Sequence, residues 1–167
     1  MDWNEFLIRH GSALVMYARQ WASTHADAEE IVQDAVLRYW RSVQEGKVPC
    51  DNPLPLVYTN IKWVALDRLR EQKRRNGRET AAGEMIYDDT VFEQVKVDAE
   101  RTEKLGRAVA GLPLEQREVV IMKIWDDMTF QEIADTLGLS INTVASRYRY
   151  AMARMKTMLK KEGVEYE

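Results

Sequence analysis

Residues 129–155, TFQEIADTLGLSINTVASRYRYAMARM, predict two helices joined by a tight turn. The first part of this stretch carries apolar residues at three- and four-residue spacing, which predicts one buried face of a short helix that ends at Leu137. Gly138 can take the left-handed conformation that follows a helix end, and Ser140 is a good N-cap for the next helix.

The second helix of this pair is predicted to bury an apolar stripe and to expose a basic surface. Its stripe consists of Val144, Tyr148, Met152, Met155 and Leu159. From Ile141 to Lys161 there are six basic residues and no acidic one. Short polar side chains at the helix start, followed by arginines, suit an element that lies in a DNA major groove. A solvated basic face on a helical hairpin is the alternative, but turn, cap and basic face together favour a DNA-binding helix-turn-helix.

Charge is segregated along the chain. The 24 basic and 27 acidic residues give a net charge of −3, which alone would argue against nucleic acid. However, Lys62–Arg78 has seven basic and two acidic residues, whereas Glu79–Lys104 has eight acidic and three basic ones. Such a chain can hold DNA at two basic blocks and keep the segment between them off the phosphates.

Composition narrows the class of protein further. The single cysteine, Cys50, excludes an intramolecular disulfide and fits a reducing compartment. There is no apolar run long enough for a membrane span and no basic start of a secretory signal, so we expect a cytoplasmic protein without membrane insertion. His10 and His25 are not spaced with Cys50 as metal ligands, and no phosphate loop or nucleophile elbow occurs. We therefore expect no enzyme activity, no metal and no cofactor.

The first half of the chain predicts further helices. Asp2–Gln20 is spaced for one or two helices with a break near Gly11-Ser12, and Thr24 or Asp27 can cap the next helix. The predicted buried side of that helix consists of Ile31, Val32, Ala35, Val36, Tyr39, Trp40 and Val43. Glu45–Pro55 holds three of the four prolines and is predicted to be a stiff loop.

Leu56–Arg75 follows as a helix with a basic end. Its predicted inner face consists of Val57, Ile61, Val64, Ala65, Arg68 and Leu69. Aromatic rings beside cations, as at Tyr58, Lys62 and Trp63, can stack on unpaired bases while the cations bind phosphate. The alternative is that Tyr58 and Trp63 are core aromatic residues and that the arginine run is solvated. For Trp63 the two interpretations are equally good, whereas the run Lys73–Arg75 favours phosphate contact.

The remaining segments predict a linker and one more helix. Asn76–Arg107 is acidic and poor in apolar residues, which is typical of a linker between two helical domains. Leu112-Pro113 then begins a helix whose core side consists of Val119, Val120, Met122, Ile124 and Trp125.

Several segments, in this order, resemble the bacterial sigma-70 family, and its extracytoplasmic function (ECF) group most of all. Asp27–Arg41, DAEEIVQDAVLRYWR, resembles the polymerase-binding helix of that group, and Val57–Arg75, VYTNIKWVALDRLREQKRR, resembles its promoter-melting helix. Leu112–Met158 is similar to the second conserved domain through REVV at 117–120, QEIADTLGLS at 131–140 and NTVASR at 142–147. Together these segments cover nearly the whole chain apart from the linker.

The resemblance implies an all-α protein of two small helical domains joined by a flexible acidic linker. The expected parts are a region 2-like bundle, residues 1–76; the linker, 77–107; a region 4-like helix-turn-helix, 108–161; and a tail, 162–167. It also implies a subunit of RNA polymerase that directs promoter choice and has no catalytic site. The implied partners are promoter DNA, the clamp helices and flap region of core polymerase, and an anti-sigma factor, the family's usual inhibitor.

Carried over residue by residue, the resemblance implies three sets of site residues. The set that would contact the polymerase clamp helices is Asp27, Glu30, Gln33, Asp34 and Arg38. The set that would engage the minus-ten element is Tyr58, Lys62, Trp63, Arg68, Lys73, Arg74 and Arg75, with loop Glu45–Pro55 holding an extruded base. The set that would read the minus-thirty-five element is Ser140, Asn142, Thr143, Ser146, Arg147 and Arg149.

Three positions depart from the family pattern. One is Asn60, near which the family usually has a small or apolar residue. The family usually has asparagine where this chain has Trp63, so a ring that can stack replaces an amide that hydrogen-bonds. The usual glycine before the threonine-valine pair is Asn142, which can still make a polar contact early in the helix.

Two other classes of protein also fit parts of the sequence. A free-standing regulator with a carboxy-terminal helix-turn-helix would bind a palindromic operator as a dimer, but it leaves the basic helix ending at Arg75 unexplained. An adaptor with no DNA role would tolerate the replacement of Arg147 and Arg149.

Overall fold

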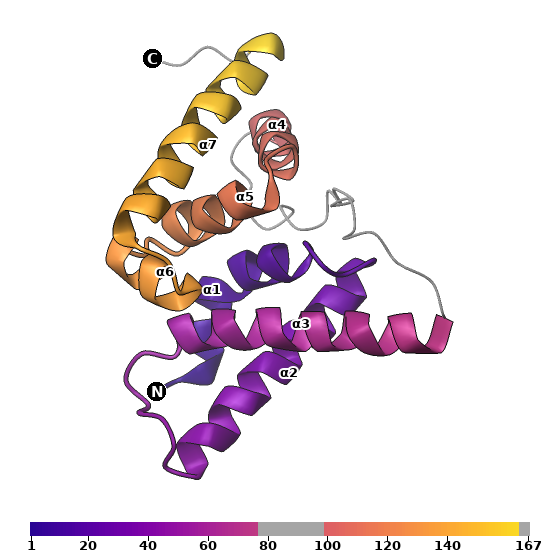
Figure 1. The fold of residues 1–167 in the computed structure, drawn as a ribbon, viewed down its shortest axis with the longest axis vertical. Helices are drawn as coiled ribbons and strands as arrows, with labels where there is room; N and C mark the ends of the chain where they lie inside the picture. The colour runs from indigo at the N-terminus through magenta and orange to yellow at the C-terminus, as the bar shows by residue number, and fades with distance from the viewer. Residues whose placement is uncertain (77–98, 164–167) are drawn as a thin grey trace. The chain divides into compact units, whose positions relative to one another are not determined.

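A computed structural model describes residues 1–76 and 99–163 of the chain (Figure 1). These residues form helices and turns and contain no β-strand, as predicted. The chain divides into two compact units, Met1–Met85 and Ile86–Glu167, and each is treated by itself. None of the described helices is both long and apolar enough to cross a membrane. Residues 77–98 of the predicted linker lie outside the described ranges.

The first unit consists of three mutually packed helices: α1 (Trp3–Ala18), α2 (His25–Gln44) and α3 (Leu54–Asn76) (Figure 1). Thr24 caps α2, since its hydroxyl accepts a hydrogen bond from the Asp27 amide at 3.1 Å. The break predicted near Gly11 is wrong, because α1 runs through it without interruption. One interior glycine costs a helix about 1 kcal/mol, and the burial of Phe6, Leu14 and Tyr17 on the same helix outweighs that cost.

Tyrosines form the centre of the first unit. Tyr17 and Tyr58 are at most 1% exposed and meet edge to face, with ring centroids 4.9 Å apart. Tyr39 is also buried, and its hydroxyl donates to the carbonyl of Pro49 at 2.8 Å. Burial raises the pKa of Tyr39, so this hydroxyl remains a donor at neutral pH. The bond fixes the loop between α2 and α3 against the bundle.

The second unit is built on the long helix α7 (Ile141–Lys161), which contacts α4 (Ala99–Ala110), α5 (Leu114–Val120) and α6 (Phe130–Leu137). Figure 1 shows α6 and α7 as a helical hairpin. Gly138 has φ 68° and ends α6 after Leu137, as predicted. A capping box fixes the other end of α6: the Glu132 amide donates to the Thr129 hydroxyl at 3.1 Å, and the Thr129 amide donates to the Glu132 carboxylate at 2.7 Å.

A π-helical turn, η2 (Ile121–Trp125), continues α5. Within α5, Arg117 is only 8% exposed, and its guanidinium donates to the carbonyls of Ala110 and Leu112 at 3.0 and 2.8 Å. Burial lowers the pKa of Arg117. This guanidinium closes the turn between α4 and α5.

Helix α4 corrects one predicted boundary. The linker was expected to reach residue 107, but Ala99–Ala110 is helical. Ala108 and Val109 are buried, with exposed fractions of 4% and 0%. Leu105, Ala108 and Val109 follow at three- and four-residue spacing. This apolar face is short and lies in an acidic part of the sequence, so the segment was predicted to be a linker and not a helix.

An ion pair joins α4 to the end of α7. Arg107 donates to both carboxylate oxygens of Glu162, at 3.0 and 3.4 Å, and these bonds lower the pKa of Glu162 below its ordinary 4.5. A carboxyl group whose pKa is lower in the folded state than in the unfolded state stabilises the fold at pH values above its unfolded-state pKa. This stabilisation is lost as the pH falls through its folded-state pKa. We therefore expect the melting temperature of Glu162→Gln to lie below that of the parent at neutral pH and to converge with it below pH 4.5. Thermal melts between pH 7 and pH 3 measure this difference, and a gap that persists at the acid end would contradict it.

Candidate nucleic-acid interface

Helix α7 separates its buried and outward residues as a DNA-reading helix requires. Val144, Ala151, Met155 and Leu159 are buried. Of the residues predicted to read the minus-thirty-five element, Ser140, Asn142 and Arg149 are exposed, and Thr143, Ser146 and Arg147 are partly exposed. Asn142, Ser146 and Arg149 follow at three- and four-residue spacing, so they share one outward face. The structure therefore brings this predicted set together at the start of one helix.

Ser140 and Thr143 also form the cap of that helix. The Ser140 hydroxyl accepts from the Thr143 amide at 3.2 Å and lies 2.9 Å from the Thr143 hydroxyl. Both hydroxyls are therefore engaged within the protein.

Substitutions at Ser140 separate its role in capping from the DNA contact predicted for it. Because alanine removes the cap, Ser140→Ala is expected to destabilise the second unit by about 1 kcal/mol. Asparagine and aspartate cap about as well as serine, so Ser140→Asn should keep both stability and DNA affinity, whereas Ser140→Asp should keep stability and weaken binding by repelling phosphate. Thermal melts and duplex-binding titrations of the three variants test this, and an unchanged melting temperature in Ser140→Ala would show that the cap contributes nothing.

The residues predicted to engage the minus-ten element differ in their exposure to solvent. Trp63 is 49% exposed, the run Lys73–Arg75 is fully on the surface, and Lys62 is partly exposed. Tyr58, in contrast, has no exposed surface. The prediction that Tyr58 contacts DNA is therefore wrong, because its ring fills the core against Tyr17.

Arg68 links two sets that the sequence kept apart. It lies on α3 but forms ion pairs with Glu30, at 3.4 Å, and with Asp34, both on α2. All three side chains are more than a third exposed, so the pairs contribute at most about 1 kcal/mol to stability. In this structure the charge of Arg68, which was predicted to contact DNA, is neutralised by Glu30 and Asp34, which were predicted to contact polymerase.

The outward face of α2 carries the whole set predicted to bind polymerase. Asp27, Glu30, Gln33, Asp34 and Arg38 are all exposed. Leu37 and Trp40 lie on this surface too, 49% and 45% exposed. The prediction that Trp40 is buried is wrong. Leu37 was not predicted as part of this surface, although its spacing from Gln33 and Asp34 was the available signal. Apolar side chains among charged ones are typical of a surface that binds another protein.

Arg38 and Trp63 form a second link between α2 and α3. The guanidinium carbon of Arg38 lies 3.7 Å from the centroid of the Trp63 ring, in cation–π contact. Next to this pair, the Asn60 amide donates to the Ala35 carbonyl at 3.3 Å. The residue predicted to bind polymerase therefore covers the aromatic side chain predicted to bind DNA.

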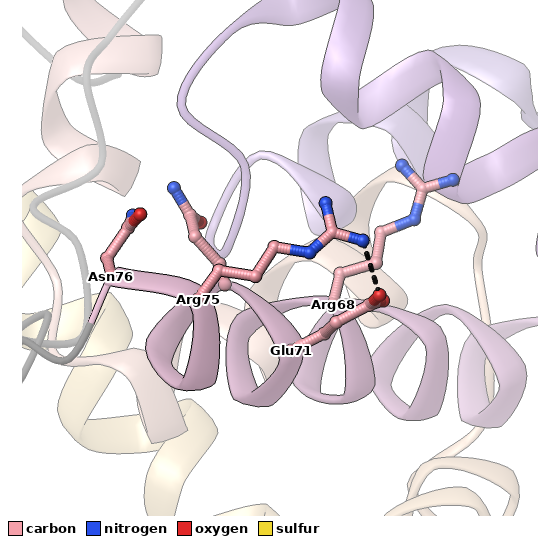
Figure 2. A pocket seen from close by; sticks show the side chains of 5 residues that line it. Arg68, Glu71, Arg75 and Asn76 are labelled. Atoms are coloured by element: carbon pink, nitrogen blue, oxygen red, sulfur yellow. Dashed lines mark hydrogen bonds and ion pairs between the residues drawn. The ribbon is translucent and has the colours of Figure 1, made fainter.

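A pocket of about 410 Å³ lies near the end of α3. Figure 2 shows its polar lining and the ion pair between Arg75 and Glu71, which measures 2.7 Å. Its lining side chains are Arg68, Glu71, Gln72, Arg75 and Asn76. Among the described residues, α3 alone supplies this lining, which includes two arginines and one glutamate. Within the described ranges, no three His, Cys, Asp or Glu side chains come together as a metal site.

The chain matches two family models, in the order in which its two units occur. The model "Sigma-70 region 2" matches residues 6–75, and the model "Sigma-70, region 4" matches residues 102–155. Together they cover well over half of the chain.

Curated relatives and solved structures agree with these matches. The ECF RNA polymerase sigma factor SigE of Mycolicibacterium smegmatis is 26% identical over 98% of this chain, which spans 64% of the length of SigE. RNA polymerase sigma factor SigV of Bacillus subtilis is 26% identical over 93% of this chain and 89% of its own length. Two solved folds are similar: RpoE, solved with the anti-sigma factor NepR from Bartonella quintana (TM-score 0.68, 23% identity, 95% of this chain and 97% of that one), and CnrH, solved with the cytosolic domain of CnrY (TM-score 0.60, 22% identity, 95% and 87%). This chain belongs to the sigma-70 family, in its ECF group.

Proposed function

We propose that this chain is an ECF sigma factor that binds core RNA polymerase and directs transcription from specific promoters. The observation that carries the proposal is the ordered pair of sigma region 2 and region 4 matches on the two units. A free-standing helix-turn-helix regulator is not favoured, because it leaves the region 2 match of the first unit without a role.

The two units would perform different tasks on the same promoter. In residues 1–76, α2 would bind the clamp helices of the largest polymerase subunit, and α3 would engage and melt the minus-ten element. Residues 99–161 would contact the flap region and read the minus-thirty-five element through α7. An unpaired base must be captured to offset an unpairing cost of a few kcal/mol, whereas duplex reading depends on contacts with base edges.

The surfaces of the described residues support this division. The exposed acidic and apolar face of α2 suits a protein partner, and the basic end of α3 and the polar and basic residues at the start of α7 suit nucleic acid. An anti-sigma factor is a further proposed partner, by analogy with RpoE, which was solved with one. This role places the protein in the cytoplasm, with the polymerase, and gives it no catalytic activity of its own.

Reconstituted transcription tests the proposal. Core polymerase incubated with this chain should produce transcripts from a limited set of promoters, and sequencing the DNA bound by the complex should give common minus-ten and minus-thirty-five elements. Core polymerase alone is the control. Binding to duplex DNA without any affinity for core polymerase would overturn the proposal.

A further inference from the structure

The contact between Arg38 and Trp63 is a cation–π contact that joins α2 to α3 in the first unit. Trp63 is an exposed aromatic residue on α3, at 49%, and the Arg38 guanidinium lies 3.7 Å from its ring centroid. Tyr58, five residues earlier on the same helix, is buried. An exposed indole that another side chain holds in place has lost much of its rotamer freedom before any ligand arrives.

Arg38 makes this contact although a carboxylate lies one helical turn away. Asp34, four residues earlier on α2, pairs with Arg68. No ion pair joins Arg38 to an acidic residue in the described ranges, and the Ser42 hydroxyl bonds to its carbonyl rather than to its guanidinium. The planar guanidinium therefore stacks on the ring and keeps N–H donors that can bind phosphate.

We propose that Arg38 is a positioning residue for promoter opening: it holds the Trp63 indole so that the uncovered ring surface stacks on an unpaired base of the melted DNA. This inference rests on the proposed function and changes one of its assignments, because Arg38 was expected to bind polymerase. Stacking on an aromatic ring accepts any base, which suits a chain that has tryptophan where its family usually has a hydrogen-bonding asparagine.

The test measures polymerase binding and promoter opening separately in the holoenzyme. The variants are Arg38→Ala, Arg38→Lys, Trp63→Ala and the double variant Arg38→Ala/Trp63→Ala. The matched control is Arg41→Ala, which removes an exposed arginine of the same helix that covers no aromatic ring. Affinity for core polymerase is measured by titration, and opening by permanganate reactivity of unpaired thymines on a linear promoter and on one with a mismatched bubble.

We expect Trp63→Ala to reduce opening by roughly ten- to hundredfold, the loss of one base stack. Arg38→Ala should reduce it by roughly three- to fivefold, the loss of one cation–π contact, and Arg38→Lys should retain only part of the effect because it lacks the planar group. The double variant should be no worse than Trp63→Ala, and the bubble template should reduce all these defects. Affinity for core polymerase should stay within about twofold of the parent, and Arg41→Ala should open the promoter normally.

Three results would overturn the inference and leave the proposed function intact. One is a weaker affinity of Arg38→Ala for core polymerase with normal opening per bound complex, which would make Arg38 a polymerase contact. Another is a double variant that loses the full sum of both single effects, since the residues would then act independently. The third is normal opening in Arg38→Ala. Failure of the unaltered chain to join core polymerase would instead overturn the proposed function, and the inference with it.

Discussion

Replacing Tyr58 with alanine is expected to unfold the first unit under conditions in which the parent chain is folded. Tyr58 has no exposed surface and packs edge to face on Tyr17. Truncating a large buried ring to alanine costs about 3–5 kcal/mol, a large part of the roughly 5–15 kcal/mol that stabilises a typical domain. Denaturant unfolding followed by tryptophan fluorescence measures this change, because Trp3, Trp21, Trp40 and Trp63 lie in the first unit and only Trp125 lies in the second.

Trp63→Ala is the matched control for this experiment. It removes a larger ring from the same helix, five residues further along, but the side chain is half exposed. Surface substitutions usually change stability by about 0.5 kcal/mol or less, so Trp63→Ala should unfold near the parent midpoint. Similar midpoints for Tyr58→Ala and the parent would show that Tyr58 is not a core residue in solution.

Replacing Arg147 with alanine is expected to change which promoters the holoenzyme selects. Arg147 lies partly exposed near the start of α7, beside Ser146 and one turn after Asn142 and Thr143. A good bidentate contact with a base contributes about 1–3 kcal/mol of discrimination. Affinity for the preferred minus-thirty-five element should therefore fall by roughly ten- to hundredfold, while affinity for unrelated duplex falls much less. Sequencing of bound promoters for parent and variant measures the change.

Arg74→Ala provides the contrast. Arg74 is exposed at the basic end of α3, where we expect it to bind phosphate, and phosphate contacts carry no sequence information. This variant should weaken binding to all promoters by a similar factor. A uniform loss in Arg147→Ala as well would rule out its role in base reading.

The elements that could be predicted from the sequence are those that local chemistry determines. The predictions of the C-terminal end of α6 and of the start of α7 were correct because Gly138 and Ser140 act on backbone groups within a few residues. The buried residues Val57, Ile61, Val64 and Ala65 of α3 were also predicted, because a regular helix repeats its face.

Two errors in predicted burial have physical causes that the regular periodicity of a helix does not reveal. Ile124 was predicted to be buried but is 44% exposed, because the π-helical turn of Ile121–Trp125 has more residues per turn and changes the phase of the helix. Tyr58 and Trp63 both follow a basic and aromatic pattern, and only the packing of α1 and α2 decides that the first is buried and the second exposed.

The site was predicted as three separate sets, and the structure connects two of them. The sequence places Glu30, Asp34 and Arg38 on one helix and Trp63 and Arg68 on another, with a loop between them. Contacts between side chains of two helices depend on the crossing of the helices, which no local pattern specifies. The ion pairs of Arg68 and the stacking of Arg38 on Trp63 therefore became visible only in the fold.

The carboxylates that hold Arg68 and Arg75 have a thermodynamic consequence for DNA affinity. A cation that binds phosphate releases condensed counterions, and each such contact steepens the plot of log K against log salt concentration by about 0.9. Where phosphate must first displace Glu30 and Asp34, or Glu71, the released carboxylates gather counterions of their own. The slope for the minus-ten contact should therefore be shallower by roughly one to two units than a count of the basic residues of α3 implies.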